Sequence, residues 1–372
     1  MRILDFRPMT VRLMSNLWGS GTSFRGHYAD KPGSNHLAAR LAARITEGFI
    51  ARRVAARSLD RSGPAIVSIG NLALGGTGKT PVVAALAGDL AAAGWKGGVL
   101  TRGFGSPLAG PLTVDPDNDL AGDEARLIAT VLASRGWPVI QARRRERGLQ
   151  HLLEVHPEIE VVVVEDGHQT AHLGRNLDVV ILDGWFVDHD DGREKVHAVT
   201  GPVLPFGPWR ESSAGADRAG IWLLETGMDM PREGQGGQAV ATFQRKLSLR
   251  DPQGDRSVDS PDGQAAILSG IARPEAFENS LLKILARDAV LAVRCGDHVR
   301  YTPRMVAKIT SAARDAGSDF LVTTAKDWVK LKPFWPAGFP LLVADLEICW
   351  GQGRTLPEIV GECLVADGHM RI

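Results

Sequence analysis

Short apolar runs of strand length alternate with longer stretches of helical length along residues 65–183. The clearest run is 161–164, four consecutive valines, and an unbroken β-branched run is typical of a strand buried on both faces. Similar runs follow the same rhythm, at 65–70, 99–101, 137–142 and 177–183. The stretches of helical length are 81–94, 124–135 and 144–156. This alternation predicts βαβ units and a mostly parallel sheet with helices on both faces.

A glycine-rich loop lies between the first strand and the first helix of this region. Residues 71–83 read NLALGGTGKTPVV, and strand, glycine loop, Lys-Thr and helix together form the P-loop arrangement. Backbone N–H groups of such a loop surround phosphate oxygens at the positive N-terminus of the helix. The predicted nucleotide-binding residues are Gly75, Gly76, Thr77, Gly78, Lys79 and Thr80. Lys79 is expected to reach the β- and γ-phosphates of ATP, and the Thr80 hydroxyl to ligate Mg²⁺. The first glycine of the general motif is replaced by Ala73, so the prediction rests on GGTGKT and its context.

Acidic residues end two of the predicted strands. Glu165 and Asp166 follow the four-valine run, and Asp183 follows the next strand. A carboxylate at such a strand end can hold the metal ion of a P-loop enzyme. It can also be only a helix cap or a turn residue. We expect Glu165 and Asp166, with Thr80, to form the magnesium site.

A change in composition divides the chain. Residues 226–263 are rich in Gly, Pro and Asp, and a second α/β pattern starts near 265 and continues to about 348. The fold class predicted is therefore α/β, a P-loop NTPase-like domain plus a second, smaller α/β domain. The expected segments are an N-terminal region at 1–62, a nucleotide-binding domain at 63–230, a linker at 231–262, the smaller domain at 263–350 and a C-terminal segment at 351–372.

The N-terminal region contains a basic amphipathic pattern at 37–58. Apolar residues recur there at helical spacing among five arginines and one acid, Glu47. It is either a surface helix packed on the protein or a helix that lies on an anionic membrane.

Composition limits the partners. Lys plus Arg equals Asp plus Glu, at 43 each, so the chain as a whole is no polyelectrolyte and we expect no nucleic-acid partner. The three cysteines, Cys295, Cys349 and Cys363, are widely spaced, which fits a reducing cytoplasm better than a disulfide framework. We also expect no secretory signal and no membrane-spanning segment, because no apolar run approaches the roughly 20 residues that a span requires.

Several short motifs occur in series along the chain and match the pattern of one known protein family. The family pattern V-G-N-L-x-x-G-G-T-G-K-T-P compares with SIGNLALGGTGKTP here. Further motifs follow in the same order: LTRGFG for S-R-G-Y/F-G, GDEA for G-D-E-P, EDGHQT for D-D-G-F-Q-H, GPWRE for G-P-L-R-E, SGIARPEAF for A-G-I-x-x-P-x-x-F, DHVRYT for D-H-H-x-Y-T and TAKDWVKL for T-E-K-D-x-V-K-L. In this order and spacing the motifs resemble those of the tetraacyldisaccharide 4′-kinase family, which phosphorylates a lipid A precursor, and the resemblance covers about residues 65–346.

The resemblance implies an enzyme that uses Mg-ATP to phosphorylate the 4′-hydroxyl of a lipid-linked disaccharide 1-phosphate. It would act peripherally on the cytoplasmic face of the inner membrane, and it requires no obligatory protein partner. Carried over from the family's motifs, Asp123 and His298 would form the base dyad, with Lys79 as the third catalytic residue. Taken by themselves, Asp123 would most simply cap the helix at 124–135, and His298 would be a surface or packing histidine.

Departures from the family pattern leave alternatives open. Glu165 replaces an Asp, His168 a Phe, Thr170 a His, Val299 a His and Ala325 a Glu. One alternative is a P-loop kinase paralogue that acts on another sugar or small molecule. Another is a non-catalytic nucleotide-dependent switch, although the guanine-reading [NT]-K-x-D motif is absent.

Overall fold

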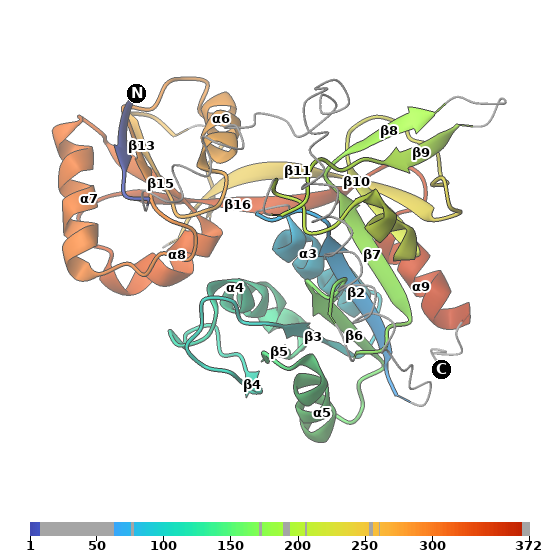
Figure 1. Ribbon diagram of the computed structural model, residues 1–372. Coiled ribbons are helices and arrows are strands. Elements are labelled where there is room, and N and C mark those ends of the chain that lie inside the picture. Colours follow the sequence, from blue (N-terminus) through green and yellow to red (C-terminus); the bar gives the residue numbers. More distant parts are fainter. Residues whose placement is uncertain are drawn as a thin grey trace.

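The computed structural model describes residues 1–7, 63–75, 78–170, 173–188, 194–204, 207–252, 256–259 and 261–366. The amphipathic pattern at 37–58 lies outside these residues, so its surface and membrane interpretations stay predictions. Figure 1 shows two lobes that are joined by long strands.

The first lobe is built on parallel strands in the order β10-β7-β2-β6-β3-β5, with β4 antiparallel at the edge. The strands are β2 (Ala65–Asn71), β3 (Gly97–Thr101), β4 (Leu112–Thr113), β5 (Val139–Gln141), β6 (Val161–Glu165), β7 (Leu177–Leu182) and β10 (Ile221–Glu225). The helices that connect its early strands are α3 (Lys79–Ala92), α4 (Asp123–Leu132) and α5 (Arg145–Val155). The predicted strands and helices of residues 65–183 therefore all form.

Alternate residues of the buried strands pack on opposite faces of this sheet. Val161 and Val163 lie in the core that contains α3 and α4, whereas Val162 and Val164 pack with Leu152 of α5 on the other face. This is why β6 has no polar position before its end: both faces are covered by helices. The fold class expected from the sequence, a mostly parallel α/β sheet with helices on both faces, is confirmed.

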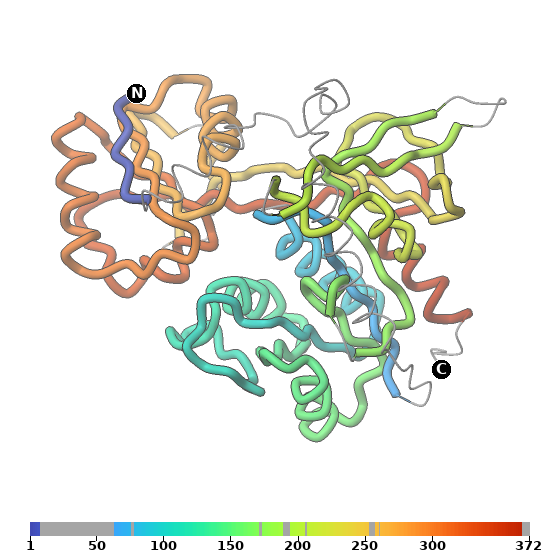
Figure 2. The backbone as a smooth tube through the Cα atoms, viewed as in Figure 1, coloured from blue at the N-terminus to red at the C-terminus, as the bar shows by residue number. Residues whose placement is uncertain are grey.

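The second lobe continues the same sheet in the order β1-β14-β13-β15-β16. Its strands are β1 (Arg2–Asp5), β13 (Ala265–Ser269), β14 (Leu291–Arg294), β15 (Phe320–Thr324) and β16 (Leu341–Trp350). Its helices are α6 (Pro274–Leu285), α7 (Pro303–Asp315) and α8 (Ala325–Leu331). The tube in Figure 2 shows the N-terminal strand beside the strands of this lobe, although it comes first in the chain.

An antiparallel ribbon joins the lobes. β11 (Ala239–Asp251) pairs with β16 from Phe243 opposite Trp350 to Arg250 opposite Val343. β10 flanks one side of the ribbon and β15 the other. The stretch 231–262, expected as a linker, thus contains a strand of the central sheet and the short β12 (Arg256–Ser257), which pairs with it. Apolar and polar residues alternate through the second half of β11, as is typical of a strand. This half therefore pairs with β16, and its hydrogen bonds connect the two lobes.

Smaller elements complete the fold. A separate hairpin is formed by β8 (Trp185–Asp188) and β9 (Lys195–Ala198), and α9 (Leu356–Ala366) packs its apolar residues into the core beside α3. The 3₁₀ helices are Ala133–Arg135, Ser213–Arg218 and Lys332–Phe334. Among the described residues, no helix combines the length and the apolarity that crossing a bilayer requires.

Candidate active site

The glycine loop turns directly into α3. Gly75 and Gly78 have φ values of 98° and 83°, a left-handed conformation that glycine adopts without steric cost. Gly78 is the N-cap of α3, and no side-chain hydrogen bond caps this helix end. A helix N-terminus of this kind offers its first N–H groups to an anion. Gly76 and Thr77, which were also predicted to bind the nucleotide, lie outside the described residues.

Lys79 lies at the centre of a polar cluster. Its Nζ donates a hydrogen bond of 2.8 Å to Oδ1 of Asn71 and lies 3.5 Å from Oδ1 of Asp166. Arg210 contacts both oxygens of Asp166, at 2.9 Å and 3.1 Å. Burial alone would favour the protonated acid, but the charges of Lys79 and Arg210 lower the pKa of Asp166 to about 2. Asp166 is therefore an ionised carboxylate held between two cations.

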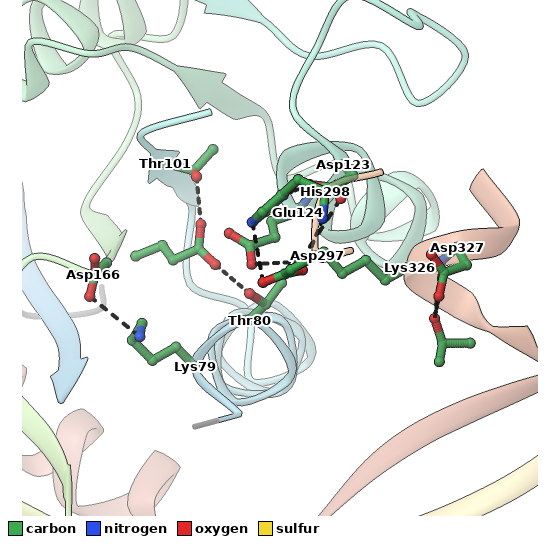
Figure 3. Close-up of polar contacts among 12 residues, drawn as sticks. Lys79, Thr80, Thr101, Asp123, Glu124, Asp166, Asp297, His298, Lys326 and Asp327 are labelled. Carbon is green, nitrogen blue, oxygen red and sulfur yellow. Dashed lines mark hydrogen bonds and ion pairs between the residues drawn. The ribbon is translucent and has the colours of Figure 1, made fainter. Parts of the chain in front are cut away.

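Thr80 and Glu165 lie in direct contact. The Thr80 hydroxyl donates a hydrogen bond of 2.6 Å to Oε1 of Glu165, and the Thr101 hydroxyl donates one of 2.5 Å to Oε2 (Figure 3). Burial first, and then the charge of Glu124, raise the pKa of Glu165 to about 7, against the effect of the two hydroxyl groups. The Glu165 carboxylate is buried, and these partners include no cation. A positive ion bound here would therefore stabilise the ionised carboxylate strongly.

Asp123 and His298 approach each other from different lobes. Asp123 is the first residue of α4, and His298 lies in the turn after β14 with a φ of 57°. Nδ1 of His298 is 2.8 Å from Oδ1 of Asp123. The N-cap of α4 is Gly122, so Asp123 is not the cap that its position alone suggested. Neither is His298 a simple surface residue, because only 16% of its side chain is exposed.

The pKa shifts of this pair have opposite signs. Burial favours the protonated form of Asp123, but the hydrogen bond with His298 and the charges of Lys326 and Lys330 lower its pKa well below the usual range. For His298, burial favours the neutral ring, yet the hydrogen bond and charge of Asp123 raise its pKa. Because an ionised carboxylate only accepts hydrogen bonds, Nδ1 carries the proton of the neutral ring, and the lone pair of that neutral ring lies on Nε2.

The structure brings the predicted residues into two groups. The first contains the Lys79–Asp166 and Thr80–Glu165 contacts, and the second is the Asp123–His298 pair; Figure 3 draws both. Glu124 connects the groups, because its charge acts on Glu165 from the start of α4. Asp166 and Glu165, predicted together as metal ligands, differ in their partners: Asp166 pairs with cations, and only Glu165 touches Thr80.

Several polar residues of the site had no role assigned from the sequence. They are Asn71, Thr101, Gln169, Lys326 and Lys330, and each contacts a predicted residue or its partner. All five lie inside motifs that the resemblance already marked. The available signal was a polar residue at the end of a buried strand, as for Asn71 and Thr101.

The departure from the family pattern at His168 concerns packing. Its side chain is wholly buried, and Nε2 lies 2.9 Å from the carbonyl oxygen of Gly215 and 3.1 Å from Arg218. Burial lowers the pKa of His168 and favours the neutral ring. His168 therefore packs against the 3₁₀ helix Ser213–Arg218, and its replacement of a Phe carries little information about the acceptor.

Sequence comparison identifies relatives over most of the chain. The family model for LpxK, tetraacyldisaccharide-1-P 4′-kinase, matches residues 37–362. A tetraacyldisaccharide 4′-kinase of Phenylobacterium zucineum is 33% identical over 299 residues, which are 77% of this chain and 82% of the relative. Another, from Methylorubrum populi, is 34% identical over 314 residues, which are 80% of this chain and 86% of the relative.

Structural comparison gives the same relationship for the fold. The crystal structure of LpxK from Aquifex aeolicus in complex with ATP aligns with a TM-score of 0.62 at 22% identity, and the alignment covers 88% of this chain and 98% of that one. At this identity the likeness concerns the fold. The motifs, the sequence matches and the fold agree, and the chain belongs to the tetraacyldisaccharide 4′-kinase family.

Proposed function

We propose that the protein transfers the γ-phosphate of ATP to the 4′-hydroxyl of a tetraacyldisaccharide 1-phosphate, a step of lipid A biosynthesis. The observation that carries this proposal is the convergence of an uncapped P-loop helix, the Lys79–Asp166 contact and the Asp123–His298 pair. Family membership supplies the identity of the acceptor. The buried position of His168 removes one reason to expect a different acceptor.

The proton chemistry follows from the geometry of the pair. A sugar hydroxyl is a poor nucleophile at neutral pH, so a base must take its proton as the oxygen attacks phosphorus. In the proposed step, Nε2 of His298 takes that proton while the new O–P bond forms and the bond between the γ-phosphorus and ADP breaks. Asp123 holds the ring through Nδ1 and stabilises the imidazolium that results. Because its own pKa is strongly lowered, Asp123 is a poor proton acceptor.

Lys79 and the helix N-terminus supply the charge that phosphate needs. The ammonium of Lys79 is held by Asn71 and Asp166, so binding of the triphosphate would replace or share these contacts. Arg210 lies on the other side of Asp166 and adds a second cation. Positioned charges of this kind account for most of the catalysis in phosphoryl transfer.

The residues present also fit a magnesium ion. Thr80 and Glu165 contribute a hydroxyl and a carboxylate, the oxygen ligands that Mg²⁺ prefers, and burial raises the pKa of Glu165, so a bound cation would stabilise its ionised form. We propose that these two residues hold the ion, and Asp166 remains a candidate ligand. When bound, Mg²⁺ would neutralise charge on the β- and γ-phosphates.

We further propose that the protein acts as a peripheral enzyme on the cytoplasmic face of the inner membrane. The support is the basic amphipathic sequence at 37–58, together with the lipid nature of the acceptor implied by the family. Sedimentation with vesicles that contain anionic phospholipid tests this part. Vesicle binding that is lost when Arg40, Arg44, Arg52, Arg53 and Arg57 are replaced by Gln supports it, and absence of binding by the intact chain contradicts it.

The decisive experiment for the activity is incubation with [γ-³²P]ATP and tetraacyldisaccharide 1-phosphate. The proposal requires label in the lipid at the 4′ position and none with the Lys79→Ala variant. Hydrolysis of ATP without label in the lipid would instead favour a kinase for another acceptor. Tight nucleotide binding without turnover would favour a nucleotide-dependent switch.

A further inference from the structure

Two lysines of α8 reach the carboxylate of the dyad from the second lobe. Nζ of Lys330 is 3.1 Å from Oδ2 of Asp123, and Nζ of Lys326 is 3.9 Å from the same oxygen. The other oxygen, Oδ1, contacts Nδ1 of His298. Asp123 thus divides its two oxygens between the imidazole and the two ammonium groups.

Lys330 is anchored by a buried acid. Its Nζ lies 3.4 Å from Oδ1 of Asp327, and Asp327 is wholly buried. The Tyr301 hydroxyl and the main-chain N–H of Gly270 donate hydrogen bonds of 3.0 Å and 2.8 Å to Asp327. Lys330 also lies over the ring of Tyr301, 5.6 Å from its centroid. This framework fixes the ammonium group where it meets Asp123.

Lys326 has acidic partners on two elements. Its Nζ is 2.9 Å from Oδ1 of Asp297 and 3.2 Å from Oε1 of Glu124. Burial disfavours its charge, but the three carboxylates of Glu124, Asp123 and Asp297 raise the pKa of Lys326. Lys326 therefore stays charged and neutralises part of the acidic cluster.

The groups that face His298 come from three elements. Asp297 belongs to its own turn and lies 3.6 Å from Nε2, Asp123 and Glu124 begin α4, and Lys326 and Lys330 come from α8. The ring of Phe104 lies 4.6 Å from the imidazole, centroid to centroid. Asp123 and Asp297 favour the imidazolium, whereas Lys326 favours the neutral ring. The protonation of His298 is therefore a balance of opposing charges.

We propose that Lys326 and Lys330 are positioning residues that hold the Asp123 carboxylate and keep the His298 imidazole neutral at the pH at which the kinase works. The inference rests on the proposed function, because it treats His298 as the base. Unopposed carboxylates would hold the ring as an imidazolium, which accepts no proton. A base is most effective when its pKa lies near the working pH. The positive charges of the lysines oppose the rise in the pKa of His298 that the carboxylates cause.

The test compares Lys326→Met and Lys330→Met in the full chain by two measurements. The first is an NMR titration of the His298 ring, assigned with His298→Gln, which requires no turnover. We expect the pKa of His298 to rise by about half a unit or more. The rise should be larger for Lys326→Met, because Lys326 contacts three carboxylates.

The second measurement is the pH profile of kcat/KM for label transfer to the lipid, which reports pKa values of the free enzyme, as the NMR titration does. Its acid limb should move to higher pH by the same amount as the ring pKa, so the loss of rate at neutral pH recovers in alkaline buffer. Lys326→Arg and Lys330→Arg retain the charge and should keep the limb close to that of the unmodified protein. Lys332→Met is the matched control, because Lys332 is 66% exposed and its carboxylate partner is Asp117, at 3.9 Å.

Two results would overturn the inference. An unchanged ring pKa with an equal loss of rate at every pH would mean that the lysines bind a phosphate group directly. An unchanged ring pKa with a lowered melting temperature would mean that they only stabilise the lobe contact. Failure of the proposed function looks different: the unmodified protein would leave the lipid unlabelled, while the ring titrations could still differ among the variants.

Discussion

Nδ1 of His298 lies 2.8 Å from Oδ1 of Asp123, although 175 positions separate the two residues in the chain. Asp123 begins α4 in the first lobe, and His298 follows β14 in the second. The proposed base is therefore completed only where the lobes meet. Arg126 of α4 also donates a hydrogen bond of 2.7 Å to the carbonyl oxygen of Val329 in α8, and this bond likewise joins the two lobes.

His298→Gln removes the proton acceptor and should lower kcat by about 10²- to 10⁴-fold. The KM for ATP should change little, because Lys79 contacts Asn71 and Asp166, whereas the His298 ring contacts Asp123. Label transfer at saturating ATP and direct nucleotide binding measure the two effects separately. An equal loss of nucleotide binding would place His298 at the triphosphate instead.

The Asp123–His298 pair should also make folding stability depend on pH. The pKa of His298 is raised above its ordinary 6.5, so its contribution is complete below that value and is lost as pH rises through the folded pKa. The pKa of Asp123 is lowered from 3.8, so its contribution is present above that value and is lost as pH falls through the folded pKa. Both contributions are present together between about pH 4 and 6.5.

Asp123→Asn should consequently destabilise the protein most within this window. Urea unfolding at pH 5.5 and at pH 8.5 measures the difference, and the loss in free energy of unfolding should be smaller at pH 8.5, because the contribution of His298 is lost as pH rises through its folded pKa. Lys326 and Lys330 remain beside the substituted side chain at both values, so they do not account for the difference. A loss that is the same at both values would show that the ion pair contributes nothing to stability.

Lys79→Ala should abolish label transfer and leave the fold intact. The substitution removes a partner of Asn71 and Asp166, but Arg210 still neutralises Asp166. We expect a change in the free energy of unfolding of about 1 kcal/mol or less. Lys96→Ala is the matched control, because Lys96 is an exposed lysine of the same lobe. Retention of more than a few per cent of the turnover would remove Lys79 from the catalytic machinery.

The magnesium proposal distinguishes two adjacent acids. Glu165→Gln keeps the size of the side chain and one oxygen that accepts from Thr80 or Thr101, whereas its amide NH2 would donate to the other hydroxyl, and the negative charge is lost. Magnesium should then no longer raise the melting temperature of the protein in complex with a non-hydrolysable ATP analogue. Because the pKa of metal-free Glu165 is raised to about 7, and a ligand must be ionised, this stabilisation in the unmodified protein should weaken as pH falls below 7. If Asp166→Asn abolishes the magnesium effect and Glu165→Gln does not, Asp166 is the ligand.

The local parts of this architecture could be predicted from the sequence. The glycine loop, the strand before it and the helix after it are neighbours in the chain, so the pattern contains all the interacting residues. The helix boundaries agree within two residues for α3, which begins at Lys79 and ends at Ala92. The predicted strand at 161–164 also agrees with β6, which ends one residue later at Glu165. Both faces of β6 are buried, so an unbroken apolar run identifies the strand.

Contacts between segments that lie far apart in the chain could not be predicted from local sequence patterns. β1 (Arg2–Asp5) pairs with β14, nearly 300 positions later, and nothing in four residues of sequence indicates that partner. The Asp123–His298 pair was proposed through family resemblance, since neither residue lies in a distinctive local pattern. Lys330 was missed because its significance depends on Asp123 in the other lobe.

Gly70→Ala and Gly88→Ala form a last pair of contrasting predictions. A Cβ on Gly70 in β2 would lie 2.4 Å from Cβ of His168, which is fixed by its contacts with Gly215 and Arg218. We expect Gly70→Ala to lower the free energy of unfolding by about 1–3 kcal/mol, because a fully packed interior has no room for the methyl group. A Cβ on Gly88 in α3 would meet no atom within 4 Å, and the change to alanine in a helix interior should stabilise by about 0.5–1 kcal/mol. Urea unfolding of both variants tests the pair. If Gly70→Ala is neutral, the turn after β6 yields to the methyl group, and the contacts of His168 with Gly215 and Arg218 do not hold its side chain rigidly.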